Sequence, residues 1–164
     1  MKRANIQVVP FRRKREGKTN YRKRIKLVAG RKHRLVVRKS LTQVSAQLIS
    51  FDVKGDVVAV GVSGKALTSI GWKGSTSNIP AAYMVGFIAG KKALANGIKD
   101  AVFDLGFHTS LHGAKVFAAL KGAIDAGLNV PSSEDAFPSE DRLMGKHIEG
   151  FANNIEDLKK KAEQ

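Results

Sequence analysis

Residues 34–62, RLVVRKSLTQVSAQLISFDVKGDVVAVGV, contain three apolar segments separated by short polar turns. The first predicted strand, Arg34–Lys39, has three aliphatic residues at its centre, and the second, Thr42–Phe51, alternates aliphatic with polar residues. Lys54-Gly55 then provides a turn into a third strand, Val57–Val62, which is rich in β-branched residues. Because connections this short join neighbouring antiparallel strands, the stretch predicts a three-stranded antiparallel meander.

The segment after the meander predicts a helix and a further strand. Asn78 is a good helix N-cap, Pro80 fits the first turn, and the helix should run to about Ala95 before Asn96-Gly97 closes it. Small residues line this helix and would allow a close approach to a sheet. Ala101–Leu105 has the pattern of a buried strand, and a helical crossover makes it parallel to the third strand. The expected fold class is therefore α/β, with the meander continuing into a mixed sheet with packed helices.

The C-terminal third of the sequence predicts three further helices, with a sequence signal that weakens from one to the next. A second helix is expected from about Leu111 to Ala126, followed by an irregular connector over residues 128–138. Ser139 can cap a third helix, and a short amphipathic helix around residues 155–161 is the weakest of the predicted elements. The last 33 residues contain eight acids and five bases, which gives this extension a net charge of −3.

Upstream of the meander, the chain is strongly basic. Sixteen Lys and Arg lie in the first 40 residues against one acid, Glu16, whereas the other 124 residues hold 13 bases and 13 acids. A block this one-sided repels itself unless an anion neutralises it, and closely spaced phosphates are the commonest such partner. Arginine is abundant here, as expected for bidentate contacts to phosphate. The charge predicts an RNA- or DNA-binding arm, of which residues 1–18 should lack regular structure until bound.

A short helix should follow within this basic segment. Thr19 or Asn20 can cap it, and Gly30 can end it. Tyr21, Ile25 and Val28 form one apolar stripe, which would dock the helix on the body while its cationic side faces outward. The expected organisation is a basic arm over residues 1–32, an α/β body over 33–130, and a connector with helical C-terminal extension over 131–164.

Composition excludes several classes of function. The chain has no Cys, so disulfides, thiolate metal sites and Cys nucleophiles are ruled out. No apolar run approaches the ~18 residues that span a bilayer, and no apolar core follows the first basic residues as in a secretory signal. Organelle-targeting peptides are also Arg-rich, but the motifs typical of a folded body that begin at Tyr21 argue against a targeting peptide here. We expect a cytoplasmic protein with no membrane partner.

Five blocks of the sequence resemble a known family in identity, order and spacing. They are NYRKRIKLVAGRKHRLVVRKSLTQVSAQL, GWKGSTSNIPAAYMVGFIAGKKAL, VFDLGFHT, VFAALKGAIDAGLNVP and FPSEDRLMGKHIEG. Together they resemble the large-subunit ribosomal protein number 18 family, in its archaeal and eukaryotic form, which binds 5S rRNA. The resemblance covers residues 5–152. The extended connector and third helix favour the archaeal type over the shorter bacterial one, and the eukaryotic version has a much longer C-terminal extension.

The resemblance implies a body similar in topology to the ribonuclease H-like fold. It also implies a structural role in the central protuberance of the large ribosomal subunit, where the protein would bind 5S rRNA, help attach it to 23S rRNA and touch neighbouring ribosomal proteins. No catalytic residue, metal or cofactor is expected. The residues that it implies in RNA contact are Arg12, Arg13, Lys14, Arg15, Lys18, Asn20, Tyr21, Arg22, Arg24, Lys26, Arg31, Arg34, Arg38, Trp72 and Lys73.

Two aromatic residues have alternative interpretations. Tyr21 could stack on an unpaired base, but packing of the short helix on the sheet is favoured because Ile25 and Val28 share its stripe. Trp72 lies in a Gly- and Ser-rich loop, where packing and a nucleic-acid contact are equally good interpretations.

Competing functions require residues that the sequence does not supply together. Gly61–Lys65 resembles a phosphate-binding loop, but Ala66 replaces the Ser or Thr that binds magnesium. Asp104 resembles a residue of ribonuclease H-like enzymes, yet no second carboxylate is evident beside it, so a structural role after the strand is favoured. His108 and His112 lack a third zinc ligand. A general nucleic-acid-compacting protein is the main alternative, and a ribonuclease H-like nuclease is the less favoured one.

Overall fold

Helix α4 (Ile79–Ala95) lies at the centre of the molecule and is buried along most of its length. In this computed structural model, which describes residues 9–151 and 153–162, the helix begins where the sequence predicts. The Asn78 side chain accepts a hydrogen bond from the Ala81 N–H at 2.8 Å, and Pro80 occupies the first turn. Asn96 follows the last helical residue. The capping prediction is confirmed at both ends.

The described residues form a sheet of four strands, β1 (His33–Lys39), β2 (Val44–Ser50), β3 (Val57–Ser63) and β4 (Ala101–Asp104). Its order is β3-β2-β1-β4. The first three strands pair antiparallel, and β4 pairs parallel with β1. The meander extended by a parallel strand is therefore confirmed, and with it the mixed α/β fold class.

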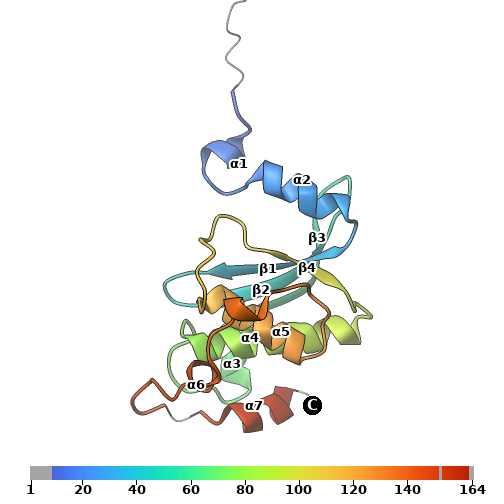
Figure 1. The fold of residues 1–164 in the computed structure, drawn as a ribbon. Helices are drawn as coiled ribbons and strands as arrows, with labels where there is room; N and C mark the ends of the chain where they lie inside the picture. The colour runs from blue at the N-terminus through green and yellow to red at the C-terminus, as the bar shows by residue number, and fades with distance from the viewer. Residues whose placement is uncertain (1–8, 152, 163–164) are drawn as a thin grey trace, which may run out of the picture.

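One face of the sheet is covered by α4 and α5 (Lys115–Asp125), as Figure 1 shows. The side chains of Leu35, Val37, Val44, Ala46 and Leu48 are inaccessible to solvent and form the sheet side of the core. Since these residues alternate along β1 and β2, the other side chains of the same strands point to the opposite face.

Two helices touch backbone to backbone inside this layer. A Cβ added to Gly86 would lie 1.8 Å from the Ala119 carbonyl oxygen, and one added to Gly122 would lie 2.0 Å from the Tyr83 carbonyl oxygen. The small residues of α4 were expected to admit the sheet. Gly86 and Gly90 instead admit α5 and its C-cap, because the atoms nearest Gly86 belong to Ala119 and those nearest Gly90 belong to Ala123 and Ala126.

The opposite face of the sheet lies beneath the N-terminal segment. Helices α1 (Arg12–Arg15) and α2 (Tyr21–Ala29) lie above this face in Figure 1, away from α4 and α5. Asn20 caps α2 by accepting the Lys23 N–H at 3.2 Å, and Gly30 follows its last residue. The turn at α1 corrects the prediction that residues 1–18 lack regular structure, although residues 1–8 lie outside the described part.

Several further helices differ from the prediction in where they begin, in how long they are, or in being present at all. Helix α5 begins at Lys115 rather than Leu111, because Gly113 has a φ of +70° that a helix does not accommodate. The helix expected after Ser139 is a single turn, α6 (Glu140–Leu143), and Ser139 makes no side-chain cap hydrogen bond. The short helices α3 (Ala66–Ser69) and η1 (Glu134–Ala136) lie in segments that were expected to be irregular.

The weakest predicted helix is present as α7 (Ile155–Ala162) and packs on α4. Ile155 and Leu158 are buried, and the Lys159 ammonium lies 4.8 Å from the centre of the Tyr83 ring. The same Tyr83 donates its hydroxyl proton to Asp125 at 2.7 Å, and burial together with this carboxylate raises its pKa. Within the described residues, no helix has the length and apolar character needed to cross a membrane.

Candidate nucleic-acid interface

Exposed cations cover the described part of the basic arm, residues 9–32. α1 consists entirely of basic residues, and more of them follow along α2 and into β1. Among residues 9–32, all of which the structure describes, eight Lys and Arg form no ion pair with a carboxylate of the described residues: Arg13, Lys14, Arg15, Arg22, Lys23, Lys26, Arg31 and Lys32. This face therefore carries unneutralised positive charge that a polyanion can bind.

The single acid of the arm does not offset this charge. Glu16 lies 2.7 Å from Arg12 and 2.9 Å from Lys18, and these two cations hold the pKa of its carboxyl below the ordinary value. Arg13 is also fixed locally, since its Nε–H donates to the Thr19 hydroxyl at 2.9 Å. These contacts fold the arm into a compact turn that presents its cations together.

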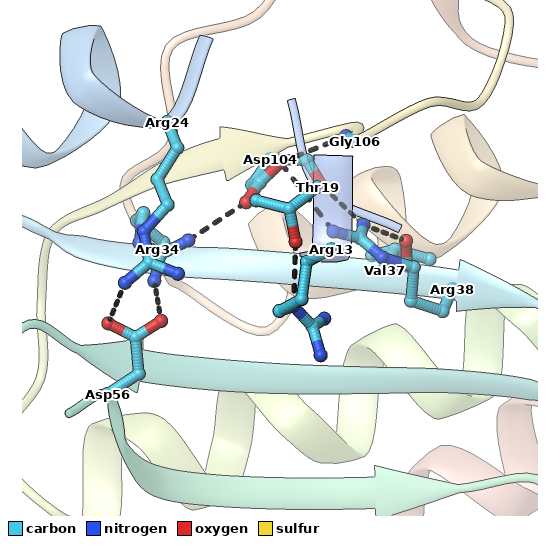
Figure 2. A network of polar contacts seen from close by, with 9 residues as sticks. All are labelled: Arg13, Thr19, Arg24, Arg34, Val37, Arg38, Asp56, Asp104 and Gly106. Atoms are coloured by element: carbon cyan, nitrogen blue, oxygen red, sulfur yellow. Dashed lines mark hydrogen bonds and ion pairs between the residues drawn. The ribbon is translucent and has the colours of Figure 1, made fainter. Parts of the chain in front are cut away.

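A buried arginine joins the sheet to the ends of two loops, as Figure 2 shows. Arg34 on β1 is 4% exposed, and its guanidinium donates to Asp104 at 3.0 Å and to Asp56 at 2.6 Å. Its Nε is also buried and has no hydrogen-bond partner among the described residues. Arg34 was predicted as an RNA-contact residue; the structure corrects this, because two carboxylates already occupy its guanidinium inside the protein.

Asp104 organises the loop that follows β4. Its carboxylate accepts the Gly106 N–H at 2.9 Å and lies 3.7 Å from Arg38, while the Arg38 guanidinium donates to the Asp104 carbonyl oxygen at 2.9 Å. Gly106 has a φ of +61°, and a Cβ there would lie 2.8 Å from Arg38. The structural role predicted for Asp104 is confirmed.

Helix α2 is attached to the body by polar contacts rather than by its apolar stripe. Ile25, which was expected to dock on the body, is 68% exposed, and no residue of α2 is fully buried. The helix is anchored instead through Arg24, whose guanidinium donates to Asp56 at 2.9 Å. Because Asp56 also binds Arg34, the position of α2 is tied directly to the buried network (Figure 2).

A cationic cavity of about 230 Å³ separates the arm from the sheet. Its basic lining comes from both sides, with Arg13, Lys18 and Lys23 above and Arg34 and Arg38 below. The two acids that line it, Asp56 and Asp104, are already engaged by the arginines of the network. The open face of the sheet is thus the floor of a positively charged site.

One arginine adopts a backbone conformation that normally favours glycine. Arg31 follows α2 with a φ of +50°, and it alone among the described non-glycine residues has a positive φ. The left-handed region costs an ordinary residue roughly 1–2 kcal/mol. A glycine would relieve this strain, so the cationic side chain occupies the position at some cost to stability.

The comparison with known families agrees with this geometry. The model of the family described as ribosomal large subunit proteins 60S L5 and 50S L18 matches residues 5–101 and 95–133. The chain belongs to this family. The match begins inside the basic arm and extends through α5, so it includes both the cationic face and the body beneath it.

Membership of this ribosomal protein family fixes the broad role of the chain. It is a structural, non-enzymatic constituent of the large ribosomal subunit in the cytoplasm, and its partners are rRNA and ribosomal proteins. The described residues contain no cluster of three metal-ligating side chains. His108 instead contacts the sheet through Lys39, and burial together with Arg38 and Lys39 lowers its pKa.

Two of the predicted contact residues of this ribosomal protein lie apart from the arm. Trp72 is 6% exposed, donates its indole N–H to Ser75 at 3.1 Å and packs edge-on against Phe151. Lys73 exchanges two backbone hydrogen bonds with the Asn153 side chain. The packing interpretation of Trp72 is thus the correct one, because its loop attaches the C-terminal extension to the body.

The aromatic residues near the arm differ from the prediction in the contacts of Tyr21 and in the presence of Phe107. Tyr21 packs against Phe11 of the arm, with ring centres 5.4 Å apart, rather than against the sheet. Phe107, in the loop after β4, is 54% exposed and lines a second cavity beside Tyr21. It was not among the predicted site residues, since a single Phe after an Asp-Leu-Gly turn gives no sign of which element it faces.

Proposed function

We propose that this protein binds 5S rRNA and helps attach it to 23S rRNA in the central protuberance. The observation that carries the proposal is the set of unpaired cations on the arm and α2, above the open face of the sheet. Each phosphate that a Lys or Arg neutralises releases counterions, which supplies affinity without base specificity. Orientation comes from the body, because the ion network fixes α2 relative to the sheet.

We further propose the division of labour that the sequence predicts. Residues 1–32 act as the binding arm on the body of residues 33–130, and residues 131–164 form the connector and helical C-terminal extension. Arg34 and Trp72 are left out of the proposed RNA contacts because they are buried. The proposed contact residues that remain are Arg12, Arg13, Lys14, Arg15, Lys18, Asn20, Tyr21, Arg22, Arg24, Lys26, Arg31, Arg38 and Lys73.

The electrostatic part can be tested with matched charge variants. In one variant Arg15, Arg22 and Lys26 are changed to Gln, and in the control Lys65, Lys160 and Lys161 are changed to Gln. All six are exposed. Since each phosphate contact contributes about 0.7–0.9 to the slope of log affinity against log salt, the first variant should lose roughly 2–3 units of slope on 5S rRNA. The control should keep the full-length slope.

Equal slopes for the two variants would contradict the proposed binding face. Competition at fixed salt between 5S rRNA and bulk RNA separates the proposal from a general nucleic-acid-compacting role. We expect unlabelled 5S rRNA to displace labelled 5S rRNA at a much lower concentration than bulk RNA does. Displacement at equal nucleotide concentrations would favour compaction without recognition of shape.

A further inference from the structure

A second cavity, of about 490 Å³, opens where three segments meet. Its lining comes from the arm at Lys14 and Gly17, from the start of α2 at Thr19 to Arg22, and from Phe107. Figure 1 shows the loop after β4 rising from the sheet toward α1 and α2. The volume lies within the ~300–1,000 Å³ of typical small-molecule sites.

Two aromatic side chains from different segments line this cavity. Tyr21 contributes from α2, with the ring of Phe11 behind it at 5.4 Å, and Phe107 contributes from the loop. Phe107 leaves about half of its surface exposed, whereas Phe87 and Phe117 are buried in the core. A large apolar side chain exposed beside a second ring provides a surface on which a flat ligand can stack.

The exposed position of Phe107 is held by the surrounding hydrogen bonds. Asp104 accepts the N–H of Gly106, and the His108 N–H donates to the Leu105 carbonyl at 3.2 Å. The Arg38 guanidinium lies directly against Gly106. The network that fixes α2 therefore also fixes this loop, so both aromatic walls are positioned by the same buried ion pairs.

The charge of the lining identifies the kind of ligand. Lys14 and Arg22 are cationic, and no carboxylate lines the cavity. The Thr19 hydroxyl is also present and can hydrogen-bond. Flat apolar walls with cations at the rim match a nucleobase and its flanking phosphates better than an apolar peptide side chain, which needs no positive charge.

We propose that this cavity receives one unpaired RNA base, stacked between Tyr21 and Phe107, with Lys14 and Arg22 on the adjoining phosphates. The site rests on the proposed RNA-binding function and adds to it a stacking contribution from Tyr21 and Phe107 that does not depend on salt. Stacking on an aromatic ring tolerates any base, so the site selects a bulged or looped nucleotide by its accessibility.

The test compares full-length Phe107→Ala with Phe51→Ala on 5S rRNA. Phe51 is 50% exposed in the β2–β3 turn and does not line the cavity, so it controls for loss of an exposed ring. Phe107→Ala should weaken binding about 5- to 150-fold with an unchanged salt slope, while Phe107→Tyr and Phe51→Ala should bind within about twofold of the parent. Urea unfolding should give the same midpoint for all of them.

A set of 5S rRNAs, each lacking the base of one unpaired nucleotide, identifies the nucleotide whose base occupies the cavity. One abasic position should weaken binding to the parent protein but cause no further loss in Phe107→Ala, because both changes remove the same stack. Parent-like binding by Phe107→Ala would overturn the base site even if the charge variants still lower the salt slope. Intact RNA binding with loss of a neighbouring ribosomal protein would instead assign the cavity to a protein side chain and overturn it as well.

Discussion

Replacement of Asp56 by Asn tests whether the buried ion network holds the binding face together. Asp56 accepts two charge-assisted hydrogen bonds, one from the buried Arg34 and one from Arg24, whose side chain is 32% exposed. Asn has nearly the same shape but no charge, and its amide would place a donor against guanidinium donors. The substitution therefore removes the charge without creating a cavity.

The expected cost follows from the burial of the two arginines. A buried hydrogen bond to a charged group contributes about 1.5–3 kcal/mol, and the more exposed pair with Arg24 contributes about 0.2–1 kcal/mol. Asp56→Asn should therefore lower the free energy of unfolding by roughly 2–4 kcal/mol. For a chain of this size that corresponds to a fall in Tm of about 4–16 °C.

Thermal and urea unfolding, followed by circular dichroism, measure this change. Asp52→Asn is the matched control, because the Asp52 carboxylate accepts only the Lys54 N–H, at 3.3 Å, among the described residues. It should stay within about 0.5 kcal/mol of the parent. Arg24→Gln should cost under about 1 kcal/mol, since it leaves the Arg34–Asp56 pair intact. If Asp56→Asn unfolds together with Asp52→Asn, the network does not stabilise the fold.

Two other substitutions test the close helix contact and the strained arginine. Gly86→Ala places a Cβ 1.8 Å from the Ala119 carbonyl, so it should cost at least about 3 kcal/mol in urea unfolding, whereas Gly30→Ala, with nothing nearer than 3.8 Å, should change stability by less than about 0.5 kcal/mol. Arg31→Gly should keep or raise the Tm because it relieves the positive φ, yet lower the salt slope on 5S rRNA by about 0.7–0.9, and Arg31→Lys should keep that slope. Tolerance of Gly86→Ala, or an unchanged slope in Arg31→Gly, would contradict these assignments.

The local sequence pattern predicted the structure correctly wherever that structure depends on residues within one short segment. The meander, the caps at Asn20 and Asn78 and the helix ends at Gly30 and Asn96 follow from turn chemistry and capping, which act over a few residues. The basic arm followed from counting charges. The family resemblance added the ribosomal role, which charge alone leaves open between several polyanion-binding functions.

Prediction from the local pattern failed where a side chain binds a residue that lies far away in the sequence. The apolar stripe of α2 indicated docking through Ile25, but the tertiary structure uses Arg24, because Asp56 lies within its reach beside the buried Arg34. The family resemblance likewise placed Arg34 among the RNA contacts, since a sequence does not show which arginine has a carboxylate on a neighbouring strand. The sequence by itself determined where the charge lies and which strands form. Only the tertiary structure decided which cations remain free to bind RNA and that Phe107 and Tyr21 line the same cavity, because both depend on contacts between residues far apart in the chain.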